Sequence, residues 1–161
     1  MIVRTAAYLL GFAVAALAAC GGDDSSDPRE PHDVPVLEIE ASRRHPVCLQ
    51  ITEDLPDEVE TLPVIDCAVP HTHEIYATLV YTEKDVYPGE EELSSFAQVE
   101  CLSEFERFVG ISAFDSSLSY TWIVPSLDGW NKEDDRKVFC ILTNRDQAKG
   151  TLKGSMRASN R

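Results

Sequence analysis

The sequence has few positively charged residues. It holds 14 lysines and arginines against 28 aspartates and glutamates, and its formal net charge at pH 7 is −14. A surface of this sign repels the phosphates of nucleic acids and disfavours direct contact with anionic lipid headgroups. The charge balance therefore excludes nucleic acid as an expected partner, and it leaves basic proteins and cations open.

The sequence also lacks an apolar run that would span a membrane as a helix, which takes about 20 residues. The longest apolar stretch, "TAAYLLGFAVAALAAC", follows Arg4 and ends at Cys20. A basic residue, a short apolar run and small residues before a cut site are typical of a secretory signal. The last four residues, "LAAC", resemble the bacterial lipobox. This resemblance implies a lipoprotein signal peptide over residues 1–19, lipid on the Cys20 sulfur and fatty acylation of its amine.

The stretch after Cys20, "GGDDSSDPREPHDVP", has almost nothing to bury. Such a segment does not offset the entropy lost on ordering, so we expect a disordered acidic tether over residues 20–45. Within it, "VLEIEA" (residues 36–41) alternates and predicts an additional edge strand. The globular domain is expected over residues 46–157, with a tail at 158–161.

Signatures of common enzyme classes are missing as well. The chain contains no G-x-S-x-G, no H-E-x-x-H and no P-loop. No carboxylate pair is singled out among the many acidic residues. We therefore expect neither an enzyme nor a cofactor.

Besides Cys20 the chain has four cysteines, and none forms a C-x-x-C pair, which argues against a zinc knuckle or a thioredoxin-like centre. An even number of cysteines in an exported chain predicts disulfides, with three alternative pairings. The four are Cys48, Cys67, Cys101 and Cys140.

Hydrophobic periodicity predicts several strands around one helix. The helix is expected within residues 87–110, after Pro88-Gly89 and before Gly110. The expected strands cover residues 46–51, 61–67, 73–82, 117–125, 136–144 and 150–157, and residues 126–135 are expected to form a loop or a short helical turn. This order predicts an α+β fold in which a small antiparallel sheet is covered by one main helix and stapled by two disulfides.

Positions on these elements favour one cysteine pairing. Cys101 lies on the apolar face of the predicted helix, which also carries Leu93, Phe96, Ala97, Phe105 and Phe108. Cys140 shares a strand face with Val138 and Leu142, so a Cys101–Cys140 bond would join helix to sheet. Cys48 and Cys67 lie on consecutive strands and form the second expected pair.

Several motifs of this chain resemble the actinobacterial septum-formation domain, a family of exported or membrane-tethered proteins. The matching pieces are "VIDCAVPHTHEIYA", "YPGEEEL", the mid-helix Cys101, "PSLDGWNKEDDRKVFCIL" and "GTLKGS", in the order and spacing of the family. The chain departs from the family with "PVC" in place of G-D-C, and with Asp134 where the family has glycine. The resemblance implies a link to cell division, and it implies no reaction or ligand.

The stretch "PHTHE" contains the strongest candidates for a metal site. His71 and His73 are two residues apart on a predicted strand and would share a face, whereas Glu74 would point to the other face. In the resembling family His71 and Glu74 match but His73 does not, which argues against a shared metal site. We therefore expect His71 to hydrogen-bond backbone or a carboxylate, and Glu74 to pair with a base such as Arg136.

Aromatic residues suggest a different surface. Tyr120 and Trp122 share a predicted strand face and Trp130 follows shortly, so the three side chains are candidates for stacking on cell-wall sugars.

Together these features predict an extracytoplasmic binding or scaffold module of the bacterial cell envelope, linked to septum formation. Lipid on Cys20 would hold it on the cell membrane, and its partner would be an envelope protein or the cell wall. The alternatives are an envelope metal-binding protein or hydrolase that uses His71, His73 and Glu74, and a glycan-binding module. Purified protein with a full complement of zinc would favour the first alternative.

Overall fold

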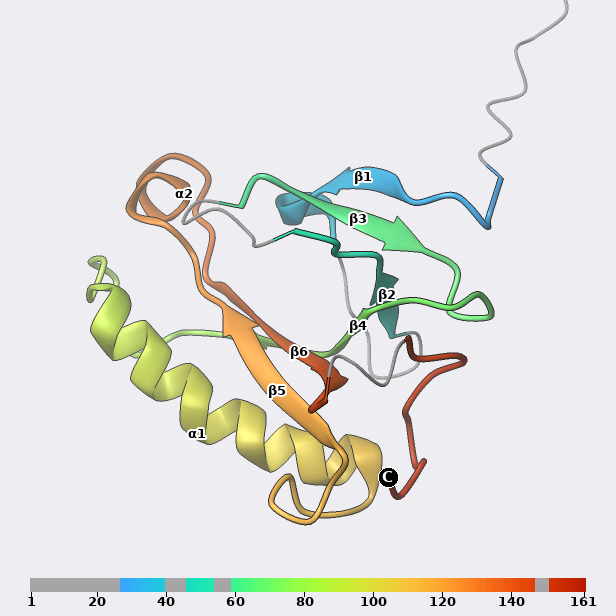
Figure 1. Ribbon diagram of the computed structural model, residues 1–161. Coiled ribbons are helices and arrows are strands. Elements are labelled where there is room, and N and C mark those ends of the chain that lie inside the picture. Colours follow the sequence, from blue (N-terminus) through green and yellow to red (C-terminus); the bar gives the residue numbers. More distant parts are fainter. Residues whose placement is uncertain (1–26, 40–45, 54–58, 147–150) are drawn as a thin grey trace, which may run out of the picture.

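The computed structural model describes residues 27–39, 46–53, 59–146 and 151–161. Its strands form a six-stranded antiparallel sheet in the order β1-β3-β2-β4-β6-β5, and helix α1 lies on one face of this sheet (Figure 1). The predicted α+β class is therefore confirmed. The strands are β1 His32–Pro35, β2 Val47–Leu49, β3 Thr61–Ile65, β4 His73–Val80, β5 Leu118–Ile123 and β6 Lys137–Asn144, and the helices are α1 Glu90–Val109, α2 Leu127–Lys132 and the short 3-10 helix η1 Val36–Glu38.

Helix α1 forms where the sequence predicts it. It begins after Gly89 with three glutamates in its first turn, where the positive end of the helix dipole favours acidic side chains. It ends at Gly110, whose φ of 97° is left-handed and whose N–H donates to the carbonyl of Glu106. The predicted apolar face is confirmed, with Phe96 only partly buried; the fully buried residues are Leu93, Ala97, Cys101, Phe105, Phe108 and Val109.

Strand β6 is buried on both faces and so divides the core into two layers. Val138, Cys140 and Leu142 pack beneath α1, in a core that also contains Tyr76 and Phe105. Phe139 and Ile141 point to the opposite face. There they meet Ile75 from β4, Leu49 from β2, Leu62 from β3, and Val36 and Ile39 from the segment after β1.

Both expected disulfides are present. Cys101–Cys140 joins the middle of α1 to β6, with 5.4 Å between the Cα atoms. Cys48–Cys67 joins β2 to the turn after β3, with 5.2 Å between the Cα atoms. Since Cys101 and Cys140 are completely buried, the helix is tied covalently to the sheet inside the core.

The prediction of a disordered tether was wrong for part of residues 20–45. His32–Pro35 forms β1, an edge strand that pairs antiparallel with β3, and Val36 and Ile39 are buried in the second core layer. The expected edge strand at residues 36–41 was also wrong, because the chain turns into η1 there. Pairing with β3 and the burial of Val36 and Ile39 together order this acidic segment. The other parts of the predicted tether, residues 20–26 and 40–45, lie outside the described residues, as do Cys20 and the signal peptide.

The C-terminal end was also predicted incorrectly. Of the strand expected at 150–157, the described residues 151–157 do not form one; Leu152 makes only an isolated bridge with His71. The expected tail at 158–161 belongs to the domain, because Ala158 and Asn160 donate backbone N–H groups to the carbonyls of Phe108 and Val109. The last carbonyls of a helix lack partners within the helix, so this segment caps α1.

The turn between α2 and β6 explains one departure from the family pattern. Ser126 caps α2, with its hydroxyl accepting from the N–H of Gly129 at 3.1 Å. Asp134 has a φ of 53°, in the left-handed region that glycine adopts without strain and that aspartate tolerates better than most residues. A glycine, which the resembling motif has at this position, would adopt this conformation without strain.

Among the helices of the described residues, none combines the length and the apolar composition that crossing a membrane requires.

Candidate functional site

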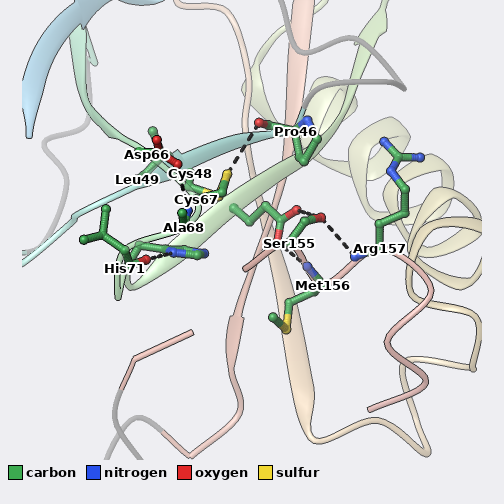
Figure 2. The surroundings of a disulfide bond; sticks show 12 residues. Pro46, Cys48, Leu49, Asp66, Cys67, Ala68, His71, Ser155, Met156 and Arg157 are labelled. Carbon is green, nitrogen blue, oxygen red and sulfur yellow. Dashed lines mark hydrogen bonds between the residues drawn. A yellow bond between two sulfur atoms is a disulfide. The ribbon is translucent and has the colours of Figure 1, made fainter. Parts of the chain in front are cut away.

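The residues of "CAVPHTHE" meet Cys48 and the C-terminal segment at one corner of the sheet. Cys48 and Glu74 are direct partners across β2 and β4, so their side chains project from the same face. The disulfide adds Cys67, and the isolated bridge to Leu152 holds His71 beside them. Figure 2 shows His71, Ser155 and Met156 around this disulfide. We call Cys48, Cys67, His71 and Glu74 the disulfide corner.

Glu74 is a completely buried carboxyl group with two donors. The hydroxyl of Ser155 donates to Oε1 at 2.6 Å, and the backbone N–H of Met156 donates to Oε2 at 2.8 Å. Burial raises the pKa of Glu74, and these two hydrogen bonds act in the opposite direction. The carboxyl group therefore holds the C-terminal segment against the sheet.

The expected pairing of Glu74 with Arg136 was wrong. Arg136 lies over the ring of Trp130, with 3.7 Å between its Cζ atom and the ring centroid, and it pairs with Asp134 at 2.9 Å. The physical reason is that Arg136 stands at the α2 turn, whereas Glu74 points to the face that the C-terminal segment covers.

His71 is completely buried and makes the predicted backbone hydrogen bond. Its Nδ1 donates to the carbonyl of Val69 at 2.8 Å, because a carbonyl only accepts. In the neutral tautomer that carries this proton, Nε2 is an acceptor, and among the described residues Nε2 has no hydrogen-bond partner. Such an atom is uncommon in a buried position.

The expected grouping of His71 with His73 was wrong. His73 begins β4 and alternation places it opposite Glu74, but His71 lies before the strand and joins Glu74 instead. His73 Nδ1 lies 2.9 Å from the hydroxyl of Thr72. Burial lowers the pKa of His73, and the nearby His71 lowers it further. The two histidines are therefore near each other, but among the described residues His71 and not His73 belongs to the group of candidate ligands with Glu74.

The corner does not have the arrangement of a hydrolytic serine. Ser155 donates its hydroxyl proton to Glu74, whereas a nucleophilic serine is hydrogen-bonded to an imidazole that removes its proton. What the corner offers chemically is a buried imidazole nitrogen and a buried carboxyl oxygen close to the Cys48 sulfur, which is itself bonded to Cys67.

The three candidate aromatic residues do not form one surface. Trp130 is 2% exposed, and it packs with Tyr81 and Tyr87 and donates its ring N–H to the carbonyl of Asp85. Its ring is therefore not available for stacking on a sugar, and the expected surface does not include it. Tyr120 and Trp122 are half-buried neighbours with ring centroids 6.2 Å apart, and their role in sugar binding stays a prediction.

A second candidate site is a groove of about 350 Å³ between η1 and α2. Aliphatic side chains and four carboxyl groups line it, together with two lysines. Lys137 donates to the carbonyl of Leu37, and Lys132 pairs with Asp128, so both lysines have partners. We call this the η1–α2 groove; its lining includes Val36, Leu37, Glu60, Val124, Asp128, Glu133, Asp135 and Phe139.

Sequence reasoning missed Ser155 and Met156 as partners of Glu74, and it missed the groove. A signal for the first was present: a glutamate beside Ile75 and Tyr76 in a strongly apolar strand needs donors when it is buried. The groove joins segments that lie far apart in the sequence, and no local pattern marks it.

Comparison with known proteins supports one family. No curated protein and no solved structure was found to match the chain. Residues 48–161, which include both disulfides, the corner and α1, match the family described as septum formation. Because this match covers most of the sequence, the chain belongs to the septum formation family.

Proposed function

We propose that the chain is a lipid-anchored scaffold on the outer side of the cell membrane, and that it acts in septum formation by binding another envelope protein. The observation that carries the proposal is the family match over residues 48–161. The lipobox-like "LAAC" supports the anchor. The proposed role is binding rather than catalysis.

The disulfides support the proposed compartment. Cys48, Cys101 and Cys140 are buried and oxidised, and disulfides of this kind form and persist outside the cytoplasm. A chain that folded in a reducing compartment would form neither disulfide.

The anchor gives the first prediction. Cys20→Ser removes the sulfur that receives the lipid, so the variant should lose its fatty acids and leave the membrane fraction. Two or more acyl chains are needed for stable anchoring, because each buried methylene contributes about 0.8 kcal/mol and one chain alone binds weakly. Fatty-acid labelling and membrane fractionation measure both effects.

Ser25→Ala, a change in the same stretch, is the matched control and should stay labelled and membrane-bound. If Cys20→Ser remains in the membrane fraction with its label, the anchor is elsewhere and this part of the proposal is wrong.

The η1–α2 groove is the proposed binding surface. The exposed Leu37 and the partly buried Val124 supply apolar contact, and the exposed Glu60, Asp128 and Glu133 add carboxyl groups around them. A partner segment with basic and aliphatic side chains complements this combination, and opposite charge speeds association. The net charge of −14 favours the same class of partner.

Site-specific photo-cross-linking in intact dividing cells tests the groove. A photoreactive side chain at Leu37, which lines the groove and is 41% exposed, should capture an envelope protein of the division site. The same group at Val99, which is 64% exposed on α1, should not capture it. Replacing Glu133 with lysine should reduce the yield of the cross-linked complex that forms from position 37, because it reverses a charge of the groove lining.

Two results would contradict the groove as the binding surface. One is equal capture from Leu37 and Val99, and the other is a Leu37 product that is insensitive to the charge of residue 133.

A further inference from the structure

We propose that opening the Cys48–Cys67 disulfide converts the disulfide corner into a binding site for a divalent transition metal ion of the zinc type, with Cys48, His71 and Glu74 as ligands. This site is independent of the proposed scaffold function. It also differs from the His71–His73 pair suggested by the sequence.

The geometry of the three residues carries the proposal. One ligand atom from each, a sulfur, an imidazole nitrogen and a carboxylate oxygen, all lie within 4.8 Å of one another, and all three residues are buried. Zinc accepts this mixture of ligands, and three protein ligands leave a fourth position for water or for the released Cys67. In the oxidised chain the Cys48 sulfur is committed to the disulfide.

The hydrogen bonds of His71 match those of a metal ligand. A ligating histidine usually donates its other ring N–H to a carbonyl or carboxylate, which fixes the tautomer. His71 donates Nδ1–H to Val69, and its bare Nε2 is buried with no hydrogen-bond partner among the described residues. A metal ion bound to Nε2 would satisfy this atom.

The carboxyl group of Glu74 is also held in a fixed orientation, as a metal ligand must be. The Ser155 hydroxyl and the Met156 N–H each bind one of its oxygens, which fixes the plane of the carboxyl group. Each oxygen keeps a second lone pair for a cation. The corner therefore has both the ligands and the outer hydrogen bonds that orient them.

The chemical step that opens the site is thiol–disulfide exchange with a dithiol. Its thiolate attacks the Cys67 sulfur, the Cys48–Cys67 bond breaks, and Cys48 leaves as a thiolate beside His71 and Glu74. The second thiol of the reagent then displaces Cys67, so that the dithiol is oxidised to a disulfide and both cysteines are reduced. Zinc binds the Cys48 thiolate, and any thiol proton it displaces passes to solvent.

The two disulfides differ in their accessibility to such a reagent. Cys67 is only half-buried, whereas Cys101 and Cys140 are completely buried. Attack at Cys67 therefore opens the corner and leaves Cys101–Cys140 intact.

A matched pair of variants tests the site without a reductant. Cys67→Ala and Cys48→Ala remove the same disulfide, so both lose the same cross-link, but only Cys67→Ala keeps the proposed sulfur ligand. Every sample carries Cys20→Ser, which removes the cysteine outside the two disulfides. Cobalt(II) serves as the probe, because its absorption reports thiolate and tetrahedral coordination, and zinc then displaces it. Circular dichroism verifies that each variant is folded.

We expect Cys67→Ala to bind one cobalt ion with a sulfur-to-metal absorption band, at least about tenfold more tightly than Cys48→Ala. Adding His71→Gln to both variants should abolish this difference in cobalt affinity. Adding His73→Gln to both should leave the difference unchanged. The oxidised chain should show no such band. Equal binding by the two cysteine variants, an unfolded Cys67→Ala, or tight binding that survives His71→Gln would overturn the proposal.

Discussion

Replacing both Cys101 and Cys140 with alanine is expected to lower the free energy of unfolding by about 4 kcal/mol. The bond closes a loop with a sequence separation of 39, and a disulfide stabilises chiefly by restricting the unfolded chain. Domains of this size have unfolding free energies of about 5–15 kcal/mol, so the loss is a large share of the total. Denaturant unfolding under non-reducing conditions measures it.

The matched control for this prediction is the double replacement of Cys48 and Cys67. That bond closes a shorter loop, with a sequence separation of 19. Because the stabilisation by a disulfide grows with the length of the loop that it closes, the expected loss is about 3 kcal/mol. The Cys101–Cys140 variant should therefore be the less stable of the two. A loss below about 1 kcal/mol for the buried bond would show that the helix is held to the sheet by packing alone.

The second large effect is expected for Glu74→Ala. This change leaves the N–H of Met156 buried without its acceptor and removes the partner of Ser155, at a cost of about 2–4 kcal/mol. The C-terminal segment should then detach from the corner. Amide hydrogen exchange should show reduced protection at Met156, and at Ala158 and Asn160, whose N–H groups cap α1.

Glu74→Gln separates these hydrogen bonds from the charge. The glutamine carbonyl can accept from Met156, and its amide can donate to the Ser155 oxygen. Burial opposes ionisation of Glu74, so a neutral side chain of the same shape should cost less than about 1 kcal/mol. Equal losses for alanine and glutamine would mean that the carboxylate charge, rather than hydrogen bonding, holds the segment.

The positions of the motifs that resemble the family have a structural explanation. "VIDCAVPHTHE" and "GTLKGS" lie far apart in the sequence, yet Cys67, Glu74 and Ser155 meet at the disulfide corner. "PSLDGWNKEDDR" builds the α2 turn, where Trp130 is buried under Arg136. The motifs thus mark two corners of the sheet, and the second motif also supplies part of the lining of the η1–α2 groove.

Sequence reasoning predicted the elements whose signals are local. Helix α1 has glutamates at its start and Gly110 at its end, and its apolar side chains recur at helical spacing. The cysteine pairing followed from the same periodicity, because Cys101 and Cys140 each fall on a buried face. These signals depend on neighbouring residues, and the structure confirms them.

Long-range contacts account for what was missed. β1 is a four-residue strand with an acid and a proline, and it forms because β3 offers an edge and the second core layer accepts Val36. A bulge between Ile75 and Ala77 changes the alternation along β4, so Tyr76 and Ala77 both pack beneath α1. His71 joins Glu74 because Leu152 returns across the sheet to bridge it. None of these has a local signature.

Mass spectrometry of the protein isolated from cells under thiol-trapping conditions shows whether the four core cysteines are oxidised and whether Cys20 carries lipid. The expected spectrum shows no alkylated cysteine and two disulfide-linked peptide pairs, Cys48 with Cys67 and Cys101 with Cys140, on a chain that begins with an acylated Cys20. Four alkylated thiols on a chain without fatty acid would contradict the account.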